Sequence, residues 1–452
     1  MKIISYLILL HFTLIKILGQ NSYPLIYPSS TEIVQPIHKV SFDNLRQCPK
    51  RIQGGNPKEM QGILIFNGST DGNRQVDPQI AIGGGYVVES SNKGILIFDK
   101  KGNYINGVSQ KCFNDGIDPK LFYDLHNKNF VFDLWWYYDE AKKKPVNIAV
   151  SESDDPNGAW NIYPISRSNE VDGGGIGYSK KWIGYSYPGG EENTFVLRNA
   201  EVKTGSSATI YHFNGSLGSP ILNQDNTEDL YFFEITDDSL FVIRKLSEDK
   251  NGMPYAQIIS SKKHHQKYID YPPPSPQKDT SVLVASGDRN PKNIVLQNGY
   301  IWFSQAIDYH GVSAVQWFQI HAHSGEIIQK GLIKSDTSSC IQTSIAVNKK
   351  MDVLIGFQET GKNMYISPRF TYRKSSNPKG TVREIIRYGE GQHFIHGQAW
   401  GDYSGSMVDG DNRLDLWTIQ SVPNQQGKGE TLIAKLPYRL IKKKTKFDNR
   451  IK

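Results

Sequence analysis

Long amphipathic helices, cysteine-rich segments and long apolar runs are all scarce in this sequence. Only three of the 452 residues are cysteine, which excludes a small scaffold held together by disulfides. Beyond the first 19 residues, no stretch approaches the roughly 20 apolar residues that a membrane span needs. Aromatic residues make up 11% of the chain, which is too much ring surface for a disordered protein. The sequence therefore predicts a folded, globular protein.

The net charge of +7 is concentrated at the two ends of the chain. The first 19 residues contribute +2 and residues 439–452 contribute +6, which leaves −1 for the rest. Because nothing indicates a basic face on the folded part, we expect no nucleic-acid partner. The basic C-terminal tail, residues 441–452, is interpreted as a solubilising end. The alternative is an arm that holds acidic glycans or an anionic surface.

The first 19 residues have the pattern of a secretory signal peptide. Lys2 precedes an apolar run from Ile3 to Ile15, and Gly19 is a small residue at a plausible cleavage point. We therefore expect a secreted, extracellular and monomeric protein without a transmembrane span. An uncleaved membrane anchor is the alternative.

Three features bear on that compartment. The sequons headed by Asn67 and Asn214 both read Asn-Gly-Ser, and we expect both to be exposed, glycosylated turns. Secretion also permits a disulfide, for which Cys48 and Cys112 are the candidates. The alternative is that all three cysteines are buried thiols.

Short runs of β-branched and aromatic residues dominate the rest of the chain. Examples are 94–98 and 414–419, each bounded by Gly, Asn, Asp or Pro. Segments with the 3.6-residue period of an amphipathic helix are missing. The sequence therefore predicts an all-β protein.

The strand-like runs recur as units that open with an acidic or proline-bearing turn. Residues 77–440 divide into seven units of about 52 residues, close to the roughly 50-residue period of some propeller blades. We expect a single β-propeller of seven four-stranded blades, with six blades as the alternative count and a pair of β-sandwiches as the alternative fold. Residues 20–76 form an irregular N-terminal segment, in which Gly62–Gly68 could add a strand to the last blade and close the ring.

Four segments carry a resemblance to a known family. They are 77–83, 95–102, 148–160 and 400–404. Together they resemble secreted propeller proteins with sialidase-like blades, and the resemblance spans most of residues 77–436. It implies a propeller fold and leaves the activity open, because many members of the family have no assigned task.

Within one of these segments, four residues resemble a loosened Asp box, the hairpin signature of sialidase blades: Ser153, Asp155, Gly158 and Trp160. The spacing departs from the family pattern on both sides of Gly158, and Ala159 stands where the family has Thr. In that family the box is a structural turn facing away from the active site, so it supports the fold and not the reaction.

Sialidase chemistry itself is not expected. It needs three arginines, because guanidinium groups match a carboxylate in two-point geometry. An Arg-Ile-Pro sequence is missing near the first blade. Arg74, Arg289 and Arg369 lie near unit openings, and they form no recognisable motif.

Five of the units begin with an acidic residue. If the inner strands line an axial channel, these carboxylates would lie together at one end of the channel, its mouth. Such a ring could hold Ca²⁺ through oxygen ligands or bind a polar ligand. The alternative is that each aspartate only caps a turn. The ligand-binding candidates are Asp77, Asp118, Asp172, Asp288, Arg289, Asp402 and Tyr403.

A second calcium candidate is the segment that contains Asp409, Asp411 and Asp415. Its alternating acids resemble part of a calcium loop. A tight hairpin also favours Asp, Gly and Asn at these positions, so an ordinary turn is the alternative. No other cofactor is indicated, and no catalytic residue can be assigned.

These observations predict a non-catalytic propeller that binds a glycan, a matrix component or another protein through its channel mouth and loops. One alternative is a carbohydrate-active enzyme, a sialidase-like hydrolase or a lyase on acidic sugars. Another is a structural protein of the extracellular matrix. Convergent acid, Arg and Tyr side chains would favour the enzyme, whereas an exposed aromatic platform would favour the binder.

Overall fold

The structure of the protein is a computed structural model. It describes residues 23–41, 54–70, 72, 75–113, 116–135, 145–166, 174–186, 194–236, 240–263, 272–287 and 290–442. Almost all regular structure in these residues is β-strand, as predicted. Helical segments among them are short: the 3₁₀ turn Gln110–Phe113, α2 (Asn199–Lys203) and α3 (Tyr438–Lys442).

Most strands pair antiparallel with the strand that follows them in the chain. The sheet of order β5-β6-β7-β8 contains β5 (Gln79–Gly83), β6 (Tyr86–Ser91), β7 (Gly94–Asp99) and β8 (Tyr104–Ser109). The sheet of order β2-β12-β11-β10-β9 contains β2 (His38–Ser41), β9 (Ile117–Asp124), β10 (Asn129–Trp135), β11 (Val146–Ser151) and β12 (Ala159–Ile165).

The next part of the chain forms a ten-stranded and a four-stranded sheet. In order, the larger contains β1 (Ser30–Val34), β16 (Ala208–Phe213), β15 (Thr194–Arg198), β14 (Trp182–Ser186), β13 (Gly175–Tyr178), β18 (Leu222–Asn223), β22 (Ile294–Gln297), β23 (Tyr300–Tyr309), β24 (Val312–His321) and β25 (Ile327–Ile333). The smaller contains β17 (Ser219–Pro220), β19 (Leu230–Ile235), β20 (Leu240–Glu248) and β21 (Pro254–Lys263). The short strand β18 joins the halves of the larger sheet by pairing in parallel with β13 and β22.

Two sheets remain. The four-stranded one contains β26 (Ser339–Val347), β27 (Val353–Gly361), β28 (Met364–Arg373) and β29 (Ile386–Arg387). The five-stranded one has the order β3-β4-β32-β31-β30 and contains β3 (Gly55–Met60), β4 (Ile63–Asn67), β30 (Gly405–Val408), β31 (Leu416–Pro423) and β32 (Gly429–Leu436). Hydrogen bonding alone does not close these sheets into a ring, so the predicted blade count is not settled by it.

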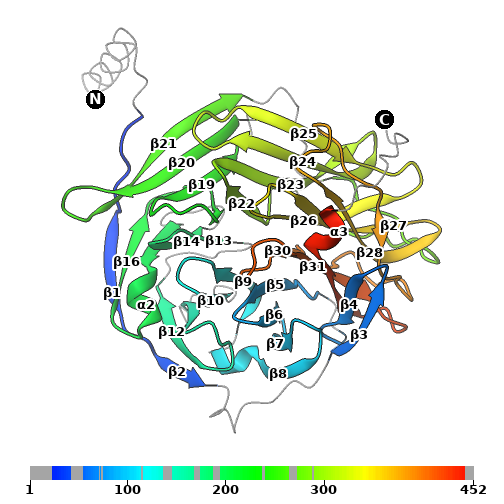
Figure 1. Cartoon of the computed structure of the whole chain (residues 1–452), viewed down its shortest axis with the longest axis horizontal. Coiled ribbons are helices and arrows are strands. Elements are labelled where there is room, and N and C mark those ends of the chain that lie inside the picture. Colours follow the sequence, from blue (N-terminus) through cyan, green and yellow to red (C-terminus); the bar gives the residue numbers. More distant parts are fainter. Residues whose placement is uncertain are drawn as a thin grey trace.

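The sheets lie around a common centre, with the first strand of each run innermost (Figure 1). Contacts between these inner strands follow a closed path: β5, β9, β13, β18, β22, β26, β30 and back to β5. Strand β4 pairs with β32, the last strand among the described residues, through Ile65 opposite Ala434. The strand predicted at Gly62–Gly68 is thus confirmed, and it ties an early segment to the end of the chain.

The N-terminal strap, residues 23–41, runs along the outer edges of three sheets (Figure 1). It was predicted to be irregular, yet β1 pairs with β16, β2 pairs with β12, and Ile26 bridges Ala256. These pairings cover strand edges that would otherwise offer unpaired backbone groups to other chains.

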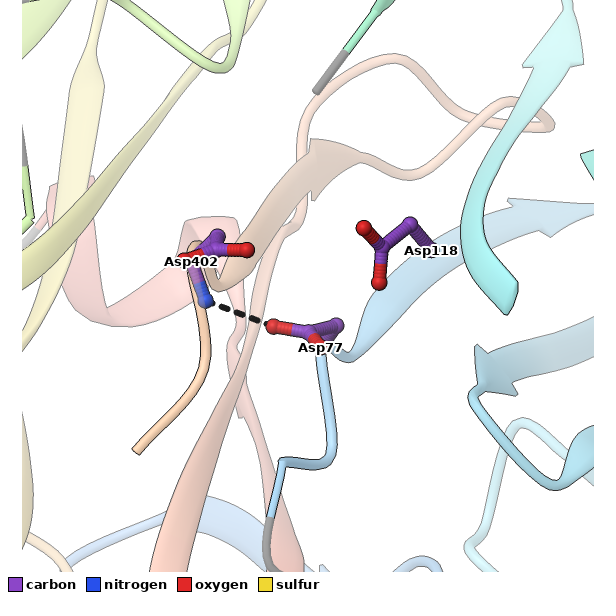
Figure 2. A group of neighbouring side chains, drawn as sticks. All are labelled: Asp77, Asp118 and Asp402. Atoms are coloured by element: carbon purple, nitrogen blue, oxygen red, sulfur yellow. Dashed lines mark hydrogen bonds between the residues drawn. The ribbon is translucent and has the colours of Figure 1, made fainter. Parts of the chain in front are cut away.

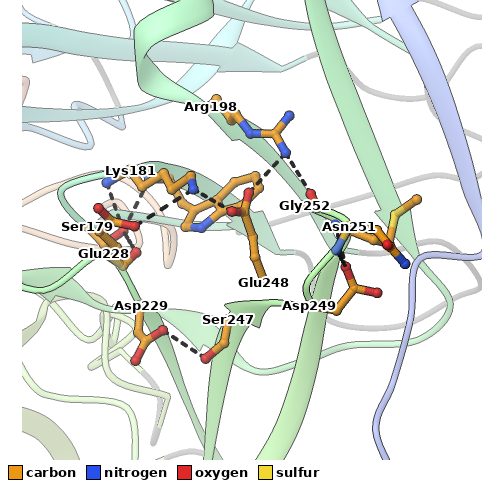
Figure 3. Close-up of polar contacts among 12 residues, drawn as sticks. Ser179, Lys181, Arg198, Glu228, Asp229, Ser247, Glu248, Asp249, Asn251 and Gly252 are labelled. Carbon is orange, nitrogen blue, oxygen red and sulfur yellow. Dashed lines mark hydrogen bonds and ion pairs between the residues drawn. The ribbon is translucent and has the colours of Figure 1, made fainter.

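Charged side chains add a further link between neighbouring sheets (Figure 3). Arg198, at the end of β15, donates to the Glu248 carboxylate at 2.9 Å and to the carbonyl oxygen of Gly252 at 2.8 Å. Lys181 pairs with the same carboxylate. The ten-stranded sheet is thereby joined to the hairpin of β20 and β21.

Large rings fill the space between sheets, as the composition predicts. Six tryptophans are buried almost completely: Trp160, Trp182, Trp302, Trp317, Trp400 and Trp417. Phe66 contacts Phe98 at 5.1 Å between ring centroids, which packs β4 of the five-stranded sheet against β7 of the neighbouring sheet. Burial of Trp400 and of Tyr403 makes these two rings part of the core, so neither offers an exposed aromatic platform.

Candidate functional site

Three of the predicted aspartates meet at one end of the inner strands (Figure 2). Asp77 precedes β5, Asp118 lies at the start of β9, and Asp402 precedes β30. Because these strands are neighbours in the centre of the molecule, carboxylate oxygens of the three residues all lie within 4.8 Å of one another. Asp77 and Asp118 are buried, whereas Asp402 is exposed.

The backbone at two of these aspartates adopts an unusual conformation. Asp77 has φ = 48° and Asp118 has φ = 51°, values in the left-handed region that only a few per cent of non-glycine residues adopt. Asp tolerates this region better than most residues because its short side chain can bond locally. Gln342, on the inner strand β26, repeats the feature with φ = 50°. The left-handed conformation therefore occurs where β5 and β9 begin and at a register shift inside β26, all near one mouth.

An asparagine in the β6–β7 turn holds two of the aspartates in place. Nδ2 of Asn92 donates to Oδ2 of Asp77 at 2.6 Å, and its Oδ1 accepts from the backbone N–H of Asp118 at 2.7 Å. The backbone N–H of Asp402 donates to Oδ1 of Asp77 at 2.6 Å. Both oxygens of Asp77 are thus occupied by donors of the protein. No local pattern singles out Asn92, which looks like an ordinary hairpin residue.

A buried lysine lies directly behind the carboxylates. Nζ of Lys120 stands 2.9 Å from the centre of the Tyr403 ring, and the Tyr403 hydroxyl donates to the carbonyl oxygen of Pro119 at 3.0 Å. Burial, together with the nearby charge of Lys292, lowers the pKa of Lys120 to about 8, against the attraction of Asp118 and Asp133. Sequence reasoning missed Lys120, because its burial follows only from the packing of β9 against the 400–404 segment.

Burial also raises the pKa of acidic residues at this end of the molecule. The pKa of Asp77 is raised to about 7 by burial and by repulsion from Asp118 and Asp402. The pKa of Asp133, on β10, is raised to about 7 by burial, with Lys120 opposing the shift. Burial and the surrounding aspartates raise the pKa of Tyr403 well above its ordinary value. The mouth therefore combines an exposed carboxylate with buried acids that hold protons near neutral pH.

Two small cavities adjoin the cluster. One, of about 10 Å³, is lined by Asp402, Gln342, Thr343 and Lys292 among others. The other, of about 20 Å³, is lined by Lys120, Lys292 and residues of β5, β9, β13 and β22. Each has room for about one water molecule. Within the described residues, a ligand larger than that would therefore contact the rim of the mouth and not enter these cavities.

Several predicted residues take no part in this cluster or lie outside the described residues. Asp172, Asp288, Arg289, Arg74 and Cys48 lie outside them. Arg369 is fully buried in an ion pair of 2.9 Å with Glu359, which makes it a structural residue. Cys112 is disulfide-bonded and Cys340 is a buried free thiol, so the alternative of three buried thiols is wrong. The pairing with Cys48 stays a prediction.

Lysines pair with all three acids of the segment predicted to bind calcium, Asp409, Asp411 and Asp415. Lys100 pairs with Asp409 at 2.6 Å and with Asp411 at 2.5 Å. Asp415 pairs with Lys435 at 2.9 Å and accepts a hydrogen bond from the backbone of Tyr438. These carboxylates are therefore neutralised by lysines, and the alternating acids form a hairpin bound to its neighbours.

The residues that resemble an Asp box form a structural turn, as expected. Asp155 Oδ1 accepts from the backbone N–H of Asn157 at 3.0 Å, and the Trp160 indole donates to the carbonyl oxygen of Pro156 at 2.9 Å. This turn follows the end of β11. Because β9 and β11 run in the same direction on either side of β10, the turn lies at the end of the sheet away from Asp118.

The two sequons differ in their surroundings. Asn214 is exposed in the turn after β16, as predicted. Asn67 is half-buried in β4, opposite Gly55 of β3 and Leu432 of β32, and Ser69 of its sequon is buried. The expectation of an exposed turn at Asn67 is therefore wrong.

No protein-family model matches the sequence, and no curated protein matches it either. Among solved structures, hydrazine synthase of Kuenenia stuttgartiensis is 11% identical with a TM-score of 0.45 and covers 83% of this chain and 98% of its own. A neuraminidase-like protein of a little yellow-shouldered bat isolate is 8% identical with a TM-score of 0.37, covering 65% and 94%. An α-L-arabinofuranosidase of Fusarium graminearum is 10% identical with a TM-score of 0.30, covering 72% and 93%. Likenesses this distant leave the ligand of this chain open.

Within the described residues, no helix has the length and apolar character that crossing a membrane requires.

Proposed function

We propose that the protein is a secreted β-propeller of seven blades that binds a glycan at its axial mouth. The closed path of contacts supports seven blades, because it passes through seven innermost positions: β5, β9, β13, the β17–β18 segment, β22, β26 and β30. On this view the ten-stranded sheet is two blades joined by β18, and β4 completes the last blade. Residues 1–19 would serve as the secretion signal.

Glycan binding is proposed because three carboxylates lie close together and one of them is exposed. A carboxylate oxygen can accept two hydrogen bonds, so an exposed carboxylate can accept from neighbouring hydroxyls of a sugar. Asp402 supplies this group, and Lys292 beside it supplies a donor. Binding at the rim also agrees with the small size of the adjoining cavities.

The burial and the hydrogen bonds of Asp77 favour binding without catalysis. A general acid needs its proton within hydrogen-bonding reach of the substrate. Asp77 is only 1% exposed, and donors of the protein contact both of its oxygens. A substrate would have to displace these bonds to reach it.

Glycoside hydrolysis is the second candidate, favoured by one observation. Asp77, with a pKa of about 7, stands beside the exposed carboxylate of Asp402. An acid with a raised pKa next to another carboxylate is how retaining glycosidases arrange their pair, with the carboxyl groups roughly 5–5.5 Å apart.

A glycan array combined with a hydrolysis screen tests both candidates on the mature protein. We expect wild type to bind a subset of glycans without releasing sugar, and Asp402→Asn to weaken binding at least tenfold. Asp336→Asn is the matched control, because Asp336 is a highly exposed acid elsewhere. An array without any bound glycan, or Asp402→Asn binding like wild type, would show the proposal to be wrong. Sugar release that Asp402→Asn abolishes would establish the hydrolase.

A further inference from the structure

The three aspartates lie close enough together to reach one bound cation. Ca²⁺ takes oxygen ligands at about 2.3–2.6 Å, so two oxygens on opposite sides of the ion lie roughly 4.6–5.2 Å apart. The ligand atoms of Asp77, Asp118 and Asp402 lie within 4.8 Å of one another. Figure 2 shows their carboxyl groups gathered around a common space. Three oxygen donors could thus reach one ion without a change in the backbone.

A buried amide oxygen gives an independent sign of a ligand at this place. The Gln342 side chain is 3% exposed, and its Oε1 has no hydrogen-bond partner within the described residues. Its Nε2 donates to the carbonyl oxygen of Gly401 at 2.6 Å, which fixes the orientation of the amide. Gln342 and Asp402 line the same cavity. A buried oxygen left without a donor is costly, and a cation would satisfy it.

We propose that Asp77, Asp118 and Asp402, with Oε1 of Gln342, bind a Ca²⁺ ion at the mouth of the propeller. All four donors are oxygens, which Ca²⁺ prefers, and the group has no His or Cys of the kind that Zn²⁺ selects. Ca²⁺ takes six to eight ligands. Because Asp402 is exposed, the remaining positions would face solvent, where water or two adjacent hydroxyls of a sugar could fill them.

The ammonium group of Lys120 does not take the place of the ion. Lys120 lines the second cavity and not the cavity that Asp402 shares with Gln342, whereas Lys292 lines both cavities. Its Nζ lies against the Tyr403 ring, and its positive charge offsets part of the negative charge of the aspartates. The sequence also predicts calcium at Asp409, Asp411 and Asp415. In the structure, lysines pair with these three carboxylates.

Calcium binding can be measured without any glycan. The mature protein is treated with EDTA, dialysed and titrated with CaCl₂ by isothermal calorimetry, and its thermal unfolding is recorded with and without 2 mM CaCl₂. We expect one ion per chain and a higher Tm with calcium. Asp402→Asn should lower the affinity at least tenfold, Gln342→Met should lower it several-fold, and the control Asp336→Asn should bind like wild type.

Any of the following results would overturn this proposal: no heat of binding and no change in Tm for wild type at 5 mM CaCl₂, Asp402→Asn binding like wild type, or equal loss in the Asp336→Asn control. The same titration with MgCl₂ checks selectivity, and preference for Mg²⁺ would also overturn it.

The part of this inference that concerns sugar hydroxyls rests on the proposed function, and a glycan array run in CaCl₂ and in EDTA separates the two. Glycan binding that EDTA abolishes supports both. Calcium binding without any bound glycan supports the ion and contradicts the proposed function. Glycan binding unchanged by EDTA, from a protein that binds no calcium, supports the function and contradicts the ion.

Discussion

The Asp411 carboxylate accepts a hydrogen bond of 2.9 Å from the backbone N–H of Gly84 and thereby joins the far ends of two inner strands. Its second oxygen accepts from Gly85, also at 2.9 Å. Gly84 has φ = 56°, and a Cβ there would lie 1.9 Å from the carbonyl oxygen of Asp154, so the turn needs glycine. Asp402 lies before β30 and Asp411 after it. The sheets are thus clamped at the end opposite the cluster of aspartates.

Replacing Asp411 tests this clamp. Asp411→Ala leaves two backbone N–H groups without their acceptor and removes one of the two carboxylates that pair with Lys100, so we expect a loss of about 1–2 kcal/mol in the free energy of unfolding. The estimate is kept low because the Asp411 side chain is 39% exposed. Urea unfolding of the variant measures it, with Asp336→Ala as the control. Equal stability of the two variants would mean that the clamp does not contribute.

The hydrogen bonds of Asp411 also predict that its contribution to stability depends on pH. Hydrogen bonds from Lys100, Gly85 and Gly84 lower the pKa of Asp411 below its ordinary value of 3.8, despite its partial burial. Its stabilisation is therefore present above pH 4 and is lost as the pH falls through the lowered pKa. The difference in stability between wild type and Asp411→Ala should shrink below pH 4. A constant difference down to pH 2 would contradict this.

Asp133 should make stability depend on pH in the opposite direction from Asp411. Its pKa is about 7 in the folded protein against an ordinary value of 3.8, so between these values the folded state binds more protons than the unfolded state. Stability then falls as the pH rises from 4 to 7, by up to about 1.4 kcal/mol per pH unit for one such group. We expect Asp133→Asn to reduce this slope without abolishing it, because Asp77 titrates in the same range. Thermal unfolding of both proteins from pH 4 to pH 8 measures the slopes, and parallel curves would refute the assignment.

Lys120 should be among the most sensitive positions in the chain. Lys120→Met removes a fully buried cation that is attracted by Asp118, Asp133 and Asp77, and leaving buried acids without that opposing charge should cost about 1–3 kcal/mol. The double variant Lys120→Met with Asp133→Asn removes part of the unbalanced charge and should regain stability. Additive losses in the double variant would show that the two groups do not interact.

Local sequence signals were enough for the strand content and for the place of the aspartates. The Asp-Pro turns at 77–78 and 118–119 and the period of about 52 residues predicted inner strands with acids at their openings. Asp77, Asp118 and Asp402 accordingly lie together. Each turn signal lies within a few residues of the chain, and the period only repeats such signals.

Features that depend on distant partners could not be predicted. The acids at 409 and 411 looked like calcium ligands because the sequence does not show that Lys100, 309 residues away, pairs with Asp409. Asn92 is connected to two aspartates only through the packing of neighbouring turns. Likewise, strap residues pair with strands more than 100 residues further along, a pairing that no local pattern encodes.

The N-terminal strap offers a prediction in which two adjacent residues should behave differently. In β1, Val34 is 7% exposed and belongs to the main core cluster, whereas Ile33 is 76% exposed, since successive side chains of a strand point to opposite faces. Val34→Lys should therefore lower the free energy of unfolding by about 2–4 kcal/mol, because it removes a buried apolar group and places a charge there. Ile33→Lys should change it by less than about 0.5 kcal/mol. Urea unfolding of the two variants measures the contrast. Equal effects would show that β1 does not pair with β16 in this register, and that the strap is not part of the folded body in solution.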